Sequence, residues 1–290
     1  MFISILINSL VSGGMFAILA VGFSLVFGVA KILNMAHTAF YMVTVFLIFI
    51  TMKILGLALP IAAILSIIVT ALLGIVCYKL CFDRVKVHQT AVMIISVAIA
   101  ILFQEIFLII FTGHFRRVPP FIPGFVTIAG VPVLNQHFFT AGASLVTLIG
   151  LWLLLSKTRL GKAIRAVEQD IEIANLFGIN VSRISMLVMG ISVGLAGIAG
   201  LVIAPVVVLH PLMWTGPLVI VLAAVVLGGM GSIKGSIIAA YILGFAETLV
   251  VFLVPGGSFL RGAVSLAIMV VVLLVRPEGL LGVAFEEERL

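Results

Sequence analysis

Nine apolar runs follow one another along this chain of 290 residues, separated by short segments that contain charge, proline or glycine. About 20 apolar residues are enough for a helix to span a bilayer. The run at 90–112, at about 1.5 Å per residue, would reach about 35 Å. The run at 217–229 is too short for a full crossing, so we expect a short or broken helix near 217–236. The runs lie at about 3–29, 36–55, 58–81, 90–112, 138–156, 185–209, 217–229, 236–254 and 259–275.

The composition leaves few other classes of protein open. Hydrophobic residues make up 64% of the chain and charged residues only 9%, whereas soluble domains carry about 25% charged residues. Soluble folds, nucleic-acid-binding proteins among them, and disordered chains are therefore excluded. We predict an all-α polytopic membrane protein with about 8–9 membrane segments, forming a single transmembrane domain over 1–290. The first run follows no basic residue, so it is expected to be a membrane helix and not a cleaved signal peptide.

The distribution of Lys and Arg predicts the orientation. We take the segments 82–89 and 157–184 and the C-terminal tail as cytoplasmic. Twelve of the 16 basic residues then fall on the cytoplasmic side. The N-terminus is then external, provided that every segment crosses completely. The four remaining basic residues, on the outer side, are Lys53, Arg116, Arg117 and Arg261.

Two connecting segments are long enough to have structure of their own. The outer one, about 113–137, contains four prolines and is expected to be rigid and irregular. The inner one contains an amphipathic helix, about 161–178, with Gly178 placed for a left-handed C-cap. This helix could lie in the lipid headgroups, or it could dock its apolar face in a groove of a cytoplasmic partner. Between Lys162 and Glu172 it has two basic and three acidic residues. Because this balance offers anionic lipid little to attract, it favours the partner. The apolar face consists of Ile164, Val167, Ile171, Ala174 and Phe177.

Four segments resemble a known family of transporters. The sequence from Glu172 to Gly178 is similar to the E-A-A-x-x-x-G coupling motif of bacterial ABC importer permeases, with Ile173 in place of the first alanine. The sequence from Gly161 to Ala166, with Asp170, Ala174 and 178–180, resembles the cytoplasmic loop of branched-chain amino-acid permeases of the LivH/LivM type, closer to LivH. Three further segments resemble this family: 28–37 (with N-x-A-H, followed by Thr38 where glycine is frequent), 227–235 (L-G-G-x-G-S-x-x-G) and 276–282 (R-P-x-G-L-x-G).

The resemblance implies a multi-pass permease subunit of the bacterial inner membrane that moves branched-chain or other neutral amino acids, or a related small amide, by alternating access. It also implies a second, LivM-like permease, two LivG/LivF-like ATP-binding subunits and a periplasmic or lipid-anchored binding protein. ATP would be used by those partners, with no cofactor bound to this chain. The residues expected to couple to the ATPases are Gly161, Arg165, Glu172, Ala174 and Gly178.

Polar residues and glycines inside the apolar runs are candidates for a pathway or gate. Asn34 and His37 could instead cap the second helix, and Glu247 could pair with Arg261. Glu105 could pair with Arg116 or Arg117, which could otherwise be solvated or receive the binding protein. The pathway and gate candidates are Asn34, His37, Gly229, Gly231, Ser232 and Glu247.

The chain shows no pattern that predicts chemistry of its own. The phosphate-loop pattern G-x-x-x-x-G-K-[ST] fails at Gly228, and Cys77 and Cys81 have no second pair of ligands nearby. We expect no catalytic residue and no metal site. The main alternative is a secondary transporter or channel driven by an ion gradient, with buried acids as a proton relay; a membrane enzyme is less favoured.

Overall fold

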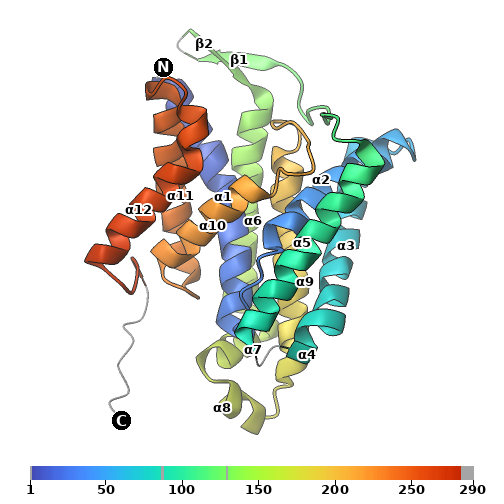
Figure 1. Ribbon diagram of the computed structural model, residues 1–290, viewed down its shortest axis with the longest axis vertical. Helices are drawn as coiled ribbons and strands as arrows, with labels where there is room; N and C mark the ends of the chain where they lie inside the picture. The colour runs from blue at the N-terminus through green and yellow to red at the C-terminus, as the bar shows by residue number, and fades with distance from the viewer. Residues whose placement is uncertain (1, 86–87, 129, 282–290) are drawn as a thin grey trace.

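The protein is an elongated helical bundle, shown in Figure 1. The computed structural model describes residues 2–85, 88–128 and 130–281. Within these residues, seven helical segments are long and apolar enough to cross a membrane, and two shorter apolar helices accompany them. The predicted all-α polytopic fold is therefore confirmed. Lys86, Gly282 and Arg289, used in the sequence predictions, lie outside the described residues.

Each of the nine apolar runs corresponds to a helix. The full-length spans include α1 (Phe2–Ala30), α5 (Gln89–Phe111), α6 (Asn135–Lys157), α9 (Val181–Ile203) and α11 (Ile233–Leu253). A sixth span joins α3 (Leu59–Cys77) to the π-helix η1 (Tyr78–Phe82) and α4 (Asp83–Val85), and the seventh joins the 3-10 helix η2 (Gly257–Leu260) to α12 (Arg261–Val275). The two short helices are α2 (His37–Lys53) and α10 (Thr215–Gly228).

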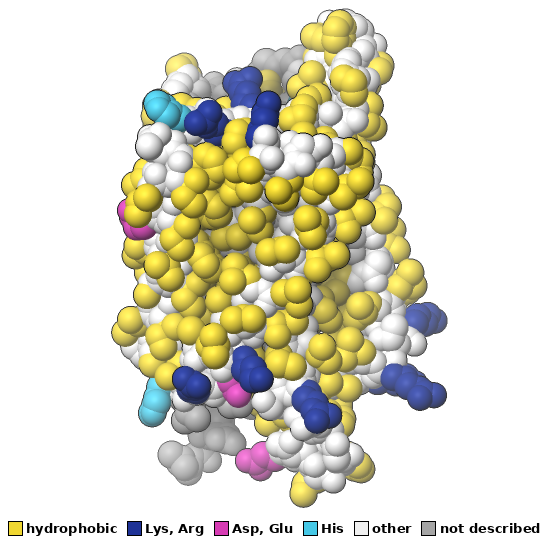
Figure 2. Space-filling model, turned by 90° about the vertical axis from the view of Figure 1, so that its right-hand side faces the viewer, with side chains coloured by type: hydrophobic (Ala, Val, Ile, Leu, Met, Phe, Trp, Pro, Cys, Tyr) yellow, Lys and Arg dark blue, Asp and Glu magenta, His cyan; other side chains and the backbone are white. Residues whose placement is uncertain are grey.

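The surface carries the pattern of a membrane protein. Figure 2 shows a broad hydrophobic belt between two bands of Lys and Arg side chains at the ends of the molecule. Among the hydrophobic side chains, Ile109 and Ile94 of α5 are strongly exposed. Exposed aliphatic residues in such number match lipid or a partner membrane protein better than water.

Helix α1 lies at the centre of the bundle. It is buried on nearly all sides, and it packs most extensively against α11 and α9. A Cβ added to Gly244 of α11 would lie 2.7 Å from the Cα of Gly13, so these two backbones touch. This position explains why the first apolar run shows no polar face: a helix that is apolar all round is buried.

The small residues of α9 allow close packing within this one chain. A Cβ on Gly190 would lie 2.9 Å from the Ile75 side chain of α3. A Cβ on Gly200 would lie 2.8 Å from the carbonyl oxygen of Tyr41 in α2. The small residues of α9 thus serve contacts with α2 and α3.

The two short helices are completed by irregular backbone inside the bundle. His37, the first residue of α2, is fully buried and lies next to Gly22, about two turns before the end of α1. Residues 31–36 therefore lead from the end of α1 back into the bundle, and residues 204–214 precede α10 in a similar way. Such backbone is tolerated at membrane depth where protein surrounds it. The prediction of a short helix near 217–229 is confirmed, whereas the short length of α2 was not foreseen.

The predicted outer loop is not wholly irregular. Strands β1 (Phe125–Ile128) and β2 (Val131–Leu134) form an antiparallel hairpin in which Phe125 pairs with Leu134. The prolines at 119, 120 and 123 precede the hairpin, and Gly130 adopts φ +79° between the strands. The four prolines argued against a helix. They do not exclude a strand, because Pro132 lies in β2 and both strands of a two-stranded sheet are edge strands, where proline is tolerated. The prediction of an irregular segment was wrong in this respect.

Candidate functional site

The predicted cytoplasmic helix at 161–178 is two helices, not one. Helix α7 (Arg159–Gln169) and helix α8 (Ile171–Leu176) meet at Asp170, whose backbone is extended. The side chain of Asp170 caps α8, because the backbone N–H of Ile173 donates to its Oδ1 at 2.9 Å. Asp is a strong N-cap residue, and this signal could have located the break. Gly178 follows α8 at φ +79°, which confirms its predicted left-handed conformation.

The predicted apolar face is used mainly inside the chain. Ile164 and Val167 of α7 are fully buried, and Ala174 of α8 is 2% exposed. The expectation that this face docks on a partner was therefore wrong for these residues. The exposed apolar side chains of this region are Ile173, Leu176 (87%) and Phe177 (82%), which we call the α8 tip. The helical periodicity could not separate the two faces, because the break at Asp170 turns α8 relative to α7.

The five predicted coupling residues divide into two groups. Arg165, Glu172 and Gly178 are exposed at the end of the bundle formed by α7 and α8. Gly161 and Ala174 are buried. A Cβ on Gly161 would collide with the carbonyl oxygens of Leu154 and Leu155, so this glycine permits the tight connection between α6 and α7.

Glu168 connects α7 to the central helix. A Cβ on Gly28 of α1 would lie 3.0 Å from Glu168 Oε1 and a Cβ on Gly231 would lie 3.6 Å from the Cα of Gly28. Burial raises the pKa of the Glu168 carboxyl, and the positive charges of Lys31 and Arg165 oppose this rise. Helix α7, the end of α1 and the turn after α10 therefore form one continuous contact.

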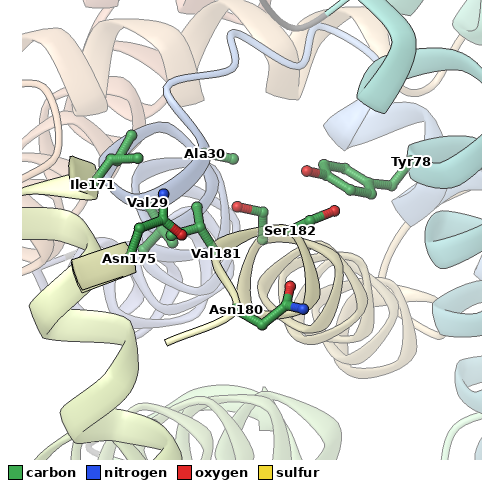
Figure 3. Close-up of a pocket in the computed structure, with 9 residues that line it drawn as sticks. Val29, Ala30, Tyr78, Ile171, Asn175, Asn180, Val181 and Ser182 are labelled. Carbon is green, nitrogen blue, oxygen red and sulfur yellow. The ribbon is translucent and has the colours of Figure 1, made fainter. Parts of the chain in front are cut away.

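A cavity of about 440 Å³ with a mixed polar and apolar lining lies between α8, the end of α1, the start of α9 and η1. Figure 3 shows Asn175 of α8, Asn180 and Ser182 lying around it, with Tyr78 on the opposite side. Val29 and Ala30 at the end of α1 complete its wall. The cavity leaves α8 without close apolar packing toward Tyr78, so α8 has room to shift there.

Asn34 and His37 are buried and hold the irregular segment before α2. The backbone N–H of Ala36 donates to Asn34 Oδ1 at 3.1 Å, which fixes a turn just before α2. Ala36 is the N-cap of α2 and no described side chain caps this helix, so the considered capping role is not found. His37 Nδ1 lies 3.3 Å from Ser192 Oγ, which donates to the Gly22 carbonyl oxygen at 2.7 Å. This network ties α1, α2 and α9 together deep inside the bundle.

The glycine-rich element at 227–235 forms a compact turn between α10 and α11. Gly229 and Gly231 have φ +97° and +89°, values that favour glycine. Ser232 caps α11, since the backbone N–H of Gly235 donates to its Oγ at 3.2 Å. The backbones of Gly228 and Gly235 touch directly. The structure brings this element to Gly28 but not to Glu247, which lies in the middle of α11.

Glu247 and Glu105 lie in different surroundings. Glu247 is 4% exposed and lines a second cavity together with Arg261, but the two side chains form no ion pair within 4.0 Å. Glu105 is exposed on α5, where Gln104 Nε2 donates to its Oε1 at 3.1 Å. Neither Arg116 nor Arg117 forms an ion pair with it within that distance, so the expected pairing is not found.

The two arginines of the outer segment are not equivalent. Arg116 exchanges backbone hydrogen bonds with Leu209 at 3.1 and 2.9 Å, and its guanidinium lies 5.9 Å from the centre of the Phe49 ring. Arg117 is exposed. A structural role thus accounts for Arg116, while Arg117 remains available for contact with another molecule.

The comparison with known families decides the class of this protein. The family described as branched-chain amino acid transport system, permease component, matches residues 5–273. The chain belongs to this family. It is a transport permease subunit of a multi-pass membrane type, as the four sequence segments predicted.

Several relatives match nearly the whole chain. The high-affinity branched-chain amino acid transport system permease protein BraD of Pseudomonas aeruginosa is 28% identical, covering 96% of this chain and 94% of its own. LivH of Escherichia coli K12 is 26% identical over 97% and 96%. A ribose import permease, RbsC of Escherichia coli K12, is 36% identical over only 34% of this chain. Among solved structures, PsaBC of Streptococcus pneumoniae in complex with Fab has a TM-score of 0.55 at 17% identity, covering 94% and 92%, which supports the fold alone.

Proposed function

We propose that this chain is one of two permease subunits in an ABC importer of the inner membrane, and that it carries branched-chain or related neutral amino acids inward. Two partner subunits hydrolyse ATP, so the chain itself needs no nucleotide site. A binding protein delivers the substrate to the end of the bundle that carries β1 and β2. Membership of the permease family and the names of the full-length relatives support this substrate class.

The exposed α8 tip is the observation that carries the proposed coupling. Leu176 and Phe177 are more than four-fifths exposed, although they lie outside the hydrophobic belt at the end of the bundle. Exposed apolar side chains of this size indicate contact with another protein. They belong to the segment from Glu172 to Gly178 that resembles the coupling motif. We therefore assign them to the groove of an ATPase subunit.

Movement of this region can reach the membrane helices through contacts that the structure contains. Glu168 of α7 meets α1 at Gly28, and Gly28 meets the turn at Gly231. The cavity beside Asn175 gives α8 space to move. We propose that the segment from Asn34 to His37 and the turn from Gly229 to Ser232 are the hinges of the gate. The first joins α1 to the short helix α2, and the second joins the short helix α10 to α11 beside Gly28 of α1.

The orientation follows from the basic residues. The N-terminal end of α1 lies at the same end of the bundle as β1 and β2, and α7 and α8 lie at the opposite end. Residues 280 and 281 donate backbone hydrogen bonds to Leu227 and Gly228 near the latter end. With Lys162, Arg165 and Arg183 there, we assign that end, and with it the C-terminal segment, to the cytoplasm.

Stimulation of ATPase activity by the binding protein tests both the function and the docking of Arg117. The complex is reconstituted from this chain, the second permease and both ATPase subunits, and the loaded binding protein is added. We expect stimulation of the wild-type complex, a reduction of severalfold in Arg117→Glu, and retention in Arg117→Lys, which keeps the positive charge. No stimulation of the wild type would contradict the importer, whereas equal stimulation of all three would remove only the role of Arg117.

A further inference from the structure

A second cavity, of about 550 Å³, lies beside the N-terminal half of α1. Its wall also includes parts of α10, α11 and α12 and of the irregular segment 204–214. Most of its lining is apolar, with Met15, Phe16, Ile220 and Val251 among the contributors. Its volume falls within the range of about 300–1,000 Å³ that is typical of small-molecule sites.

Glu247 supplies a buried acid to this cavity. Its side chain is 4% exposed, and no described residue forms a hydrogen bond with its Oε1. The neighbouring Thr248 does not satisfy it, because the Thr248 hydroxyl donates to the Gly244 carbonyl oxygen at 2.8 Å. A buried carboxyl within a membrane helix is costly, and such groups normally face a partner or a transport pathway.

Arg261 brings the opposite charge to the same cavity. It is the first residue of α12 and is close enough to Glu247 for an electrostatic interaction. The described side chains nevertheless form no ion pair within 4.0 Å. The cavity therefore has a buried acidic group and an exposed basic group on its wall that are not joined to each other, with largely apolar surface around them.

We propose that this cavity is a binding site of the permease itself for a zwitterionic amino acid with an apolar side chain. Glu247 accepts hydrogen bonds from the α-ammonium group, Arg261 donates to the α-carboxylate, and the apolar wall formed by Met15, Phe16 and Ile220 receives the side chain. This inference rests on the proposed function and adds a specificity site within the membrane to the selection made by the binding protein. A polyol or an uncharged amide would not require two separated opposite charges.

The direct test measures binding to the nanodisc-reconstituted complex without its binding protein. Radiolabelled leucine is the probe, and two analogues compete with it: 4-methylpentanoate, which lacks the ammonium group, and 3-methylbutylamine, which lacks the carboxylate. We expect Glu247→Gln to lower the affinity for leucine and for 3-methylbutylamine by about tenfold or more. The affinity for 4-methylpentanoate should be unchanged. Arg261→Gln should lower the affinity for leucine and for 4-methylpentanoate and leave the affinity for 3-methylbutylamine unchanged.

Thr147→Val is the matched control, because the Thr147 hydroxyl donates within its own membrane helix, to the Ala143 carbonyl oxygen at 2.7 Å, and Thr147 does not line the cavity. It should bind all three compounds as the wild type does. Glu247→Asp, which keeps the charge, should retain part of the leucine affinity and serves if Glu247→Gln does not fold. Equal loss for both analogues in each charge variant, or no loss at all, would overturn the site. The proposed function would still stand if the wild-type complex shows stimulation by the binding protein.

Discussion

Gly235→Ala is expected to prevent stable folding of the permease. A Cβ at this position would overlap the carbonyl group of Gly228, so the N-terminal turn of α11 could no longer lie against the C-terminal end of α10. Both contacting groups are backbone, and no side chain can rotate away to make room. Overpacking typically costs about 1–3 kcal/mol, and we expect a cost at or above the upper end of that range here.

The measurement is the melting temperature and the yield of monodisperse protein in detergent. Gly150→Ala is the matched control, because Gly150 lies in a membrane helix and no neighbouring atom would lie within 4 Å of its added Cβ. This control should be neutral, or stabilising by up to about 1 kcal/mol through higher helix propensity. Equal stability of the two variants would contradict the close approach of α10 and α11.

The double variant Leu176→Asp, Phe177→Asp should lose its ATPase subunits while keeping its fold. Both side chains are largely exposed, so their replacement removes little packing within the chain. In the complex they would be buried, and a carboxylate in an apolar groove is strongly unfavourable. We expect recovery of ATPase subunits with the tagged permease to fall by at least tenfold.

The control for this variant is Phe259→Asp, since Phe259 is 93% exposed in η2, at the start of the last membrane segment. It should recover ATPase subunits as the wild type does, and all variants should elute alike in gel filtration. Full recovery of ATPase subunits by the double variant would contradict the assignment of the α8 tip.

The apolar runs were predictable from the sequence because lipid imposes a simple requirement on length and hydropathy. All nine runs match helices, and the short run at 217–229 is a short helix. The burial of α2 was harder to foresee. Its run at 36–55 is long enough to span, but His37 contacts Ser192, which is 155 residues away in sequence.

The candidate site was only partly predictable. Gly178 was recognisable by local turn chemistry, which acts over a few residues. Ser232 was expected to line a pathway or gate, and its capping of α11 was not foreseen. The outward-facing side of α8 could not be predicted from the sequence. The apolar face was inferred from one continuous helical period over 161–178, and the cap at Asp170 interrupts that period. Glu247 could be identified as unusual from its apolar surroundings, but its cavity depends on five separate parts of the chain.

Uptake into sealed liposomes tests the central claim most directly, namely that α7 and α8 receive work from ATP hydrolysis in partner subunits. The reconstituted complex, with binding protein outside and ATP supplied to the ATPase subunits, should accumulate radiolabelled leucine against its gradient, and ionophores that collapse proton and sodium gradients should not prevent this. The double variant Leu176→Asp, Phe177→Asp should accumulate none. Accumulation by this chain alone, without ATPase subunits and driven by a proton or sodium gradient, would contradict the account.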